Sequence, residues 1–138
     1  MPQVHINYLA VVVAAVASFA IGGLWYSPVL FARQWVNAHG YSEEQVKEMQ
    51  KGAGKSYAIS VLCQLLIALA IAVLLSYLHF ANWIQGLKLG LLLWAGLAFP
   101  LGLMATMFTG KKMAVFLIDT GYQLVYLLLM GVVLTVWQ

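Results

Sequence analysis

The stretch that decides the fold is Met113–Trp137, which reads MAVFLIDTGYQLVYLLLMGVVLTVW. It is longer than the roughly 20 apolar residues that an α-helix needs to cross a hydrocarbon core about 30 Å thick. Asp119 is the only charged residue in this stretch. A carboxylate at the centre of a membrane helix costs roughly 2.5–3.5 kcal/mol, and less near the ends of the helix. Asp119 is therefore the first candidate for a functional residue.

Three further apolar stretches have a similar length, and the four together cover approximately residues 4–27, 56–78, 87–108 and 113–137. Of the 138 residues, 64% are hydrophobic and 8% are charged, against about 25% charged residues in an average soluble domain. The sequence predicts an all-α fold, a four-transmembrane-helix bundle that forms a single membrane domain over residues 1–138. The lipid bilayer is its first expected partner.

The segment 28–55, between the first two long helices, is predicted to form short interfacial helices. Pro28 has no amide hydrogen, so the first long helix must stop or kink there. Ser27 then suits the N-cap of a short helix. Ser42 and Gln45 have the spacing of a capping box at the start of a second short helix, which is rich in charge. This second helix is either a solvated connector or a docking surface.

The stretch 87–108 combines small residues with a proline. Gly86 and Gly90 are four residues apart, and small residues at that spacing let membrane helices approach closely. Pro100 deprives the Gly96 carbonyl of its intrahelical hydrogen bond, so that carbonyl needs another partner in a dry membrane. The result is either a packing kink or a contact with a hydroxyl, a water or a ligand. The glycine-rich face also predicts a homo-oligomer.

Basic residues indicate how the bundle is oriented. Six of them fall in the two connections that must share one side of the membrane: Arg33, Lys47, Lys51, Lys55, Lys111 and Lys112. Only Lys88 falls on the opposite side. Because basic residues favour the cytoplasmic side, both termini are predicted outside the cytoplasm, which for a bacterial inner membrane means the periplasm. The aromatic belt at the cytoplasmic interface is expected to contain Trp25, Trp35 and Tyr41.

Asp119 has polar companions. Tyr122, Gln123 and Tyr126 follow it at spacings of three, four and seven residues, so these side chains share one helical face. Counting from Lys112, Asp119 lies roughly 10 Å below the cytoplasmic end of its helix. The residues expected near that depth on the other helices are Tyr26, Ser27, Gln64, Gly96 and Pro100. The sequence thus predicts a polar site in the cytoplasmic half, which either holds the helices together or receives a ligand or a proton.

Enzyme motifs are absent from the sequence. It has no nucleophile elbow, no glycine-rich phosphate loop and no pair of residues with metal-ligand spacing on a helix. The net charge of +3 is too small and too scattered for a nucleic-acid-binding surface. We therefore expect no enzyme, no cofactor, no metal site and no nucleic-acid partner. The expected ligand is a small molecule or a lipid.

Several short motifs resemble a known family. They are Asn7-Tyr8-Leu9-Ala10, Gly23-Leu24-Trp25-Tyr26-Ser27-Pro28 with Phe31, and Asp119-Thr120-Gly121-Tyr122 with Met130-Gly131. In these motifs the chain resembles the domain of unknown function 1761 family of small, mainly bacterial membrane proteins, and the similarity covers nearly its whole length. The WYSP element is the most specific part. The resemblance implies a four-helix membrane protein, and it supplies neither an activity nor catalytic residues.

Two classes of function agree with these features. One is a small transporter or channel subunit, oligomeric, that uses the Asp119 face for protons or for a cationic substrate. The other is a non-transporting membrane protein that binds a lipid, a hydrophobic ligand or a partner protein. A water-filled route across the membrane beside Asp119 would favour the first class, and a dry groove filled by lipid would favour the second.

Overall fold

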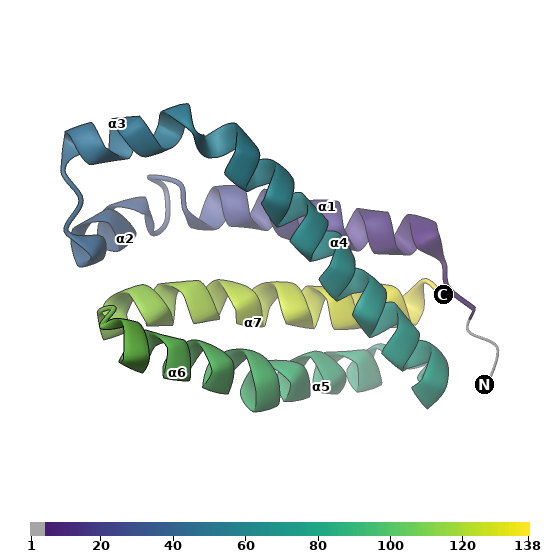
Figure 1. Ribbon diagram of the computed structural model, residues 1–138. Coiled ribbons are helices and arrows are strands. Elements are labelled where there is room, and N and C mark those ends of the chain that lie inside the picture. The colour runs from purple at the N-terminus through teal and green to yellow at the C-terminus, as the bar shows by residue number, and fades with distance from the viewer. Residues whose placement is uncertain (1–4) are drawn as a thin grey trace.

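Four long apolar segments build the fold in a computed structural model that describes residues 5–138 (Figure 1). Each is long and apolar enough to cross a membrane: α1 (Tyr8–Trp25), α4 (Ala53–Leu78), the segment Trp83–Thr109 that contains α5 and α6, and α7 (Met113–Val136). Residues 5–138 contain no strand, and the predicted all-α, four-helix fold is confirmed. The helix boundaries differ from the predicted ones by a few residues. The predicted start of the first helix at Val4 lies outside the described residues.

The turn after α1 corrects one detail of the prediction. Ser27 is not an N-cap, because helix α2 (Ala32–His39) begins several residues later. Pro28 cannot supply the N–H that would bond the Leu24 carbonyl. The Ser27 hydroxyl donates to that carbonyl instead, with an Oγ–O distance of 2.6 Å. The Ser27 side chain therefore finishes α1 rather than starting α2.

Helix α3 (Glu43–Lys51) confirms the predicted capping box. The Ser42 hydroxyl accepts a hydrogen bond from the Gln45 N–H (3.2 Å), and the Gln45 side chain accepts one from the Ser42 N–H (2.8 Å). Helix α4 follows α3 almost directly and runs obliquely across α1 and α7 (Figure 1). The first turns of α4 consequently project away from the bundle together with α3.

The third long segment is interrupted by a π-helical turn. Its parts are α5 (Trp83–Leu93), the π segment η1 (Trp94–Ala98) and α6 (Phe99–Thr109). At the end of η1 the Phe99 N–H bonds to the Trp94 carbonyl, five residues back. Pro100 follows directly and has no N–H to offer to the Gly96 carbonyl. The irregularity expected around Pro100 thus takes the form of a π turn, which is rare in proteins and is frequently found at functional sites.

Glycines bring α5 and α7 into backbone contact. A Cβ atom added to Gly86 would overlap the backbone of Gly131, and one added to Gly90 would overlap the backbone of Leu127. The glycine face that was expected to remain free for a second copy is therefore used inside the chain. The glycine-rich face therefore does not support the predicted homo-oligomer. Gly96, by contrast, is exposed and has open space around it.

The two ends of the bundle differ in chemistry. Toward the end that holds both termini (Figure 1), the apolar core contains Val11, Ala14, Ile71, Leu75, Met130 and Leu134. At this end the side-chain nitrogen of Asn7 donates to the Trp137 carbonyl (3.4 Å), and that of Gln138 donates to the Phe80 carbonyl (2.7 Å). The opposite end, where α1 finishes and α7 begins, carries Asp119 and most of the basic residues.

Candidate functional site

Asp119 accepts two hydrogen bonds from neutral aromatic donors. The Tyr26 hydroxyl lies 2.5 Å from Oδ1, and the indole Nε1 of Trp35 lies 3.1 Å from the same oxygen. Oδ2 accepts no hydrogen bond from the described residues. The one salt bridge found within residues 5–138 joins Lys51 to Glu48 on α3, so no ion pair neutralises the Asp119 carboxylate there. The side chain is partly buried.

Contacts of α1 and α2 with α7 hold the two donors, Tyr26 and Trp35, close to Asp119. Tyr26 is the residue at which α1 ends, and Trp35 belongs to α2, which packs against α7. The indole Nε1 of Trp25 donates to the carbonyl of Ile118, next to Asp119, at 2.9 Å. The end of α1 and the whole of α2 are therefore held close to the same turn of α7.

Two aromatic side chains contact the carboxylate, and further rings pack against them. The Tyr26 ring lies edge-on to Trp35, with centroids 5.9 Å apart, and Trp35 contacts the His39 ring at 4.2 Å. His39 stacks on Tyr41 with nearly parallel rings at 4.7 Å. We call Asp119, Tyr26, Trp35, His39 and Tyr41 the Asp119 cluster. The faces of aromatic rings are electron-rich, so a cation that is paired with Asp119 and lies over one of these faces would be stabilised further.

Tyr122 forms a second polar contact one turn further along α7. Its hydroxyl donates to the Ser18 carbonyl (2.6 Å) and accepts from Nε2 of Gln64 (3.0 Å). Gly22 permits this approach, because a Cβ atom there would lie 2.6 Å from the Tyr122 hydroxyl. Ser18 Oγ and Gln64 Oε1 are buried without a hydrogen-bond partner among the described residues. The Tyr122 ring is edge-on to Tyr26 at 5.8 Å, so the two polar groups adjoin.

Burial changes the proton affinity of two residues at this end. Burial lowers the pKa of His39 below its ordinary value of 6.5, the negative charge of Asp119 opposes this effect, and Lys111 adds to it. Burial raises the pKa of Tyr26 above its ordinary value, and the hydrogen bond and charge of Asp119 raise it further. Tyr26 is therefore a protonated donor at neutral pH, and His39 is mostly uncharged.

The structure brings together only some of the predicted site residues. Those that lie in the Asp119 cluster or contact one another beside it are Asp119, Tyr26, Gln64, Tyr122 and Tyr126, whose ring lies 4.9 Å from that of Tyr122. Gln123 lies inside the bundle, but its Oε1 has no partner among the described residues. Ser27 bonds to the end of α1. For Gly96 and Pro100, no hydrogen bond or ring contact with this group is found in residues 5–138.

Trp35 and His39 belong to the site, although they were not among the site residues predicted from the sequence. They are four residues apart on α2 and share one face, which is a signal that the sequence contained. What the sequence did not contain is the direction of that face, which turns toward α7. Trp94 of η1 was also missed. Its indole donates to the carbonyl and the hydroxyl of Thr120, at 2.9 and 3.1 Å, immediately beside Asp119.

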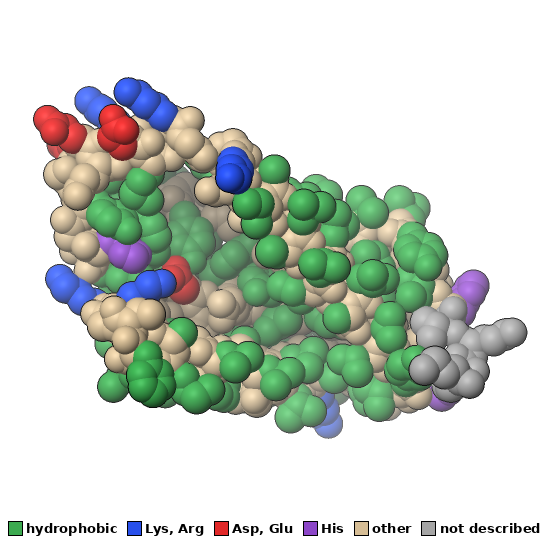
Figure 2. All heavy atoms as spheres, viewed as in Figure 1, with side chains coloured by type: hydrophobic (Ala, Val, Ile, Leu, Met, Phe, Trp, Pro, Cys, Tyr) green, Lys and Arg blue, Asp and Glu red, His purple; other side chains and the backbone are tan. Residues whose placement is uncertain are grey.

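The molecular surface is hollowed at this end. Figure 2 shows the hollow between α3 and α4 on one side and α6 and α7 on the other, with acidic and histidine side chains inside it and basic side chains at its rim. No group of three His, Cys, Asp or Glu side chains in the described part of the chain could hold a metal ion. The chemistry offered is one carboxylate among aromatic rings, which suits a single positive charge.

An all-helical bundle with four membrane-length apolar segments defines the class of protein, a polytopic α-helical membrane protein. Residues 9–135 match the family described as Protein of unknown function (DUF1761). The match covers nearly the whole chain, so the chain belongs to this family, as its motifs predicted. Neither a curated protein nor a solved structure matches the chain. The family supplies no activity, and the function must be argued from the site.

Proposed function

We propose that this protein binds a small organic cation, an ammonium compound, through the Asp119 cluster. The observation that carries the proposal is the partly buried Asp119 carboxylate, which has aromatic neighbours and no ion-pair partner among the described residues. Charged groups within membrane segments face the bundle interior or a water-filled cavity, and they pair with one another or with backbone carbonyls. Aromatic rings recognise quaternary ammonium groups by cation–π attraction, and the Asp119 carboxylate would add the counter-charge. The proposed role is binding, without catalysis.

The hydrogen bonds around Asp119 are compatible with a bound cation. Tyr26 and Trp35 both donate to Oδ1 of Asp119. Both are neutral groups, so they do not neutralise the negative charge of the carboxylate. Oδ2 stays available for a ligand. Oδ2 is not among the buried side-chain atoms that lack a hydrogen-bond partner within residues 5–138, so it is accessible to a ligand.

We also propose the orientation that the basic residues favour, in the inner membrane of a bacterium. The connections at the Asp119 end carry six Lys and Arg residues, whereas the opposite connections carry only Lys88. By the positive-inside rule the cluster then faces the cytoplasm, and both termini lie in the periplasm.

The proposal is tested by equilibrium binding of tetramethylammonium to the full chain in lipid nanodiscs. We expect Asp119→Asn to weaken binding by about tenfold or more, which corresponds to about 1.4 kcal/mol. Asparagine keeps the shape and one hydrogen-bond acceptor, so helix packing is retained. The matched control is Glu43→Gln, which removes one exposed carboxylate at the start of α3 and should leave binding unchanged. Equal binding by wild type and Asp119→Asn would contradict the proposal.

A second candidate function is a subunit of an oligomeric transporter for such a cation. The observation that favours it is the π turn η1, where the third segment is irregular and Trp94 bonds to Thr120 beside the cluster. The opposite half of the chain is filled by the apolar core, so a route across the membrane would run between copies. Uptake of tetramethylammonium by proteoliposomes, together with crosslinking to a dimer or larger species, tests this candidate. Recovery of only the monomer after crosslinking, together with no uptake by the proteoliposomes, would contradict this candidate.

A further inference from the structure

We infer that the ligand is a lipophilic cation, an ammonium group on a long alkyl chain, which enters sideways from the membrane between α4 and the α6–α7 pair. This inference rests on the proposed binding of a cation at Asp119 and specifies the ligand class and the path. It follows from the shape of the hollow, from the chemistry of its walls and from the charges at its rim.

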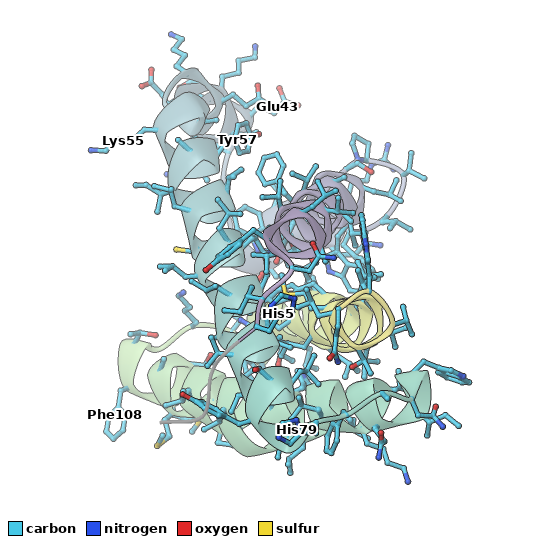
Figure 3. All side chains as sticks on the ribbon, turned by 90° about the vertical axis from the view of Figure 1, so that its right-hand side faces the viewer. His5, Glu43, Lys55, Tyr57, His79 and Phe108 are labelled. Carbon is cyan, nitrogen blue, oxygen red and sulfur yellow. The ribbon has the colours of Figure 1, made fainter. Side chains whose placement is uncertain are left out.

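The first observation is that α4 diverges from the bundle on the side of the hollow. Every residue from Gly54 to Ser60 is exposed, whereas Gln64, Ala68, Ile71 and Leu75 further along α4 are buried. In this part of α4 the one ring contact is that of Tyr57 with Phe19 of α1, on the side away from α6. Figure 3 shows Lys55 on α4 and Phe108 on α6 pointing outward on the same side of the molecule, at two edges of this opening.

The second observation is that side chains along the opening lead toward Asp119. Cys63 of α4 is exposed, and the next residue, Gln64, donates from Nε2 to the Tyr122 hydroxyl of α7. Tyr126 contacts Tyr122, Tyr122 contacts Tyr26, and Tyr26 bonds to Asp119. The visible walls of the hollow are mainly hydrophobic (Figure 2). An alkyl chain fits along these walls while its ammonium group meets the carboxylate.

The third observation is the distribution of charge. Figure 2 shows basic side chains at the rim of the hollow, and the exposed residues Arg33, Lys111 and Lys112 lie in α2 and in the turn before α7, at this end of the bundle. These charges repel a cation that approaches from water. A cation that is already partitioned into the bilayer avoids the rim, because it reaches Asp119 through the gap beside α4. Charge complementarity thus favours a lipophilic cation over a water-soluble one.

The test compares dodecyltrimethylammonium with tetramethylammonium in nanodiscs, using one substitution that fills the opening. We expect Cys63→Trp to weaken binding of the long-chain compound by about tenfold and binding of tetramethylammonium by less than about twofold. The matched control is Leu62→Trp, since Leu62 is the neighbouring residue on α4, is 60% exposed and points about 100° away around the helix. It should change neither affinity.

Each outcome distinguishes the two proposals. If Asp119→Asn weakens binding of neither compound, the proposed function is wrong and this inference is wrong with it. If binding of tetramethylammonium depends on Asp119 but Cys63→Trp does not weaken binding of the long-chain compound, lateral entry is wrong and the proposed function stands. Equal loss of both compounds in Cys63→Trp also overturns lateral entry.

A second measurement on the wild-type chain guards against misfolding of the tryptophan variant. A dodecyltrimethylammonium probe with a diazirine on its chain is photocrosslinked, and the labelled peptides are mapped. We expect labelling around Cys63 and Tyr126 that excess unlabelled compound removes and that Asp119→Asn abolishes. Labelling spread evenly over exposed α5 residues such as Leu92, or crosslinks from a second copy that fills the hollow, would overturn the inference.

Discussion

Asp119 is stabilised by donors that do not neutralise it. Tyr26 and Trp35 provide two hydrogen bonds to one carboxylate oxygen, and both donors are uncharged. Hydrogen bonds to a charged group are stronger than neutral ones, so they offset part of the cost of burying the carboxylate. The remaining negative charge is available for a cation, which is the physical basis of the proposed site.

At the residue scale, the sequence predicted the polar residues of α7 better than their partners. Asp119 and Tyr122 share a helical face by spacing alone, and Tyr26 and Gln64 are near the right depth. Trp35 could not be assigned in the same way, because its role depends on α2 folding back onto α7. Gly96 and Pro100 have suitable depth, but Gly96 is exposed, because depth along a helix does not fix the direction around it.

The pKa of His39 gives a pH-dependent prediction. Burial lowers this pKa in the folded chain below the ordinary value of 6.5, so the unfolded chain binds more protons just below that pH. His39 should therefore not reduce the free energy of unfolding above pH 6.5. Below that pH the free energy of unfolding should fall as the pH drops toward the pKa of His39 in the folded chain. We expect the midpoint of thermal unfolding to fall between pH 7 and pH 5 because of His39. His39→Gln should remove this part of the change, and His5→Gln, at the opposite end, should not. The same change in both variants would contradict the assignment.

At the element scale, apolar length predicted the long helices and local chemistry set their ends. The capping box at Ser42 and the stop at Pro28 were both readable from the sequence. The π turn at Trp94–Ala98 could not be predicted from the sequence, because the residues around Pro100 are compatible with more than one pattern of backbone hydrogen bonds. The choice among them depends on packing, including the bonds from Trp94 to Thr120.

The contact between α5 and α7 gives a prediction for stability. Gly86→Ala would push a methyl group into the Gly131 backbone, and overpacking of this kind costs about 1–3 kcal/mol. We expect a clear loss in the free energy of unfolding, measured by titration with a denaturing detergent. Gly96→Ala is the matched control, because open space surrounds Gly96. It should be neutral or slightly stabilising, since alanine favours a helix over glycine. Equal losses in both variants would contradict the role given to Gly86.

At the scale of the whole molecule, the chain is divided into an apolar half and a polar half. The separation was readable from the sequence, because it follows from where charges and polar residues fall along four helices. The hollow was not readable, because it depends on the oblique path of α4 across α1 and α7 (Figure 1). Hydrophobic patterns fix the length of a membrane helix and leave its tilt to packing.

The charge distribution predicts the topology. In a chain with Cys63→Ala, a cysteine introduced as Gln138→Cys should react with a membrane-impermeant maleimide added to intact bacterial cells. One introduced as Glu48→Cys on α3 should react only after the cells are permeabilised. Both positions are exposed in the structure, so accessibility reports the side of the membrane. The reverse pattern, or labelling of both from outside, would contradict the positive-inside orientation.

The central claim is that Asp119 forms a ligand site rather than a structural contact alone, and the shift of the unfolding midpoint by ligand tests it most directly. A ligand that binds only the folded chain stabilises it by about 2.7 kcal/mol at one hundred times its dissociation constant. We expect tetramethylammonium to raise the midpoint of the wild-type chain and to leave that of Asp119→Asn unchanged. A contradictory result is an Asp119→Asn variant that is less stable while tetramethylammonium shifts neither chain, since Asp119 would then only hold the helices together.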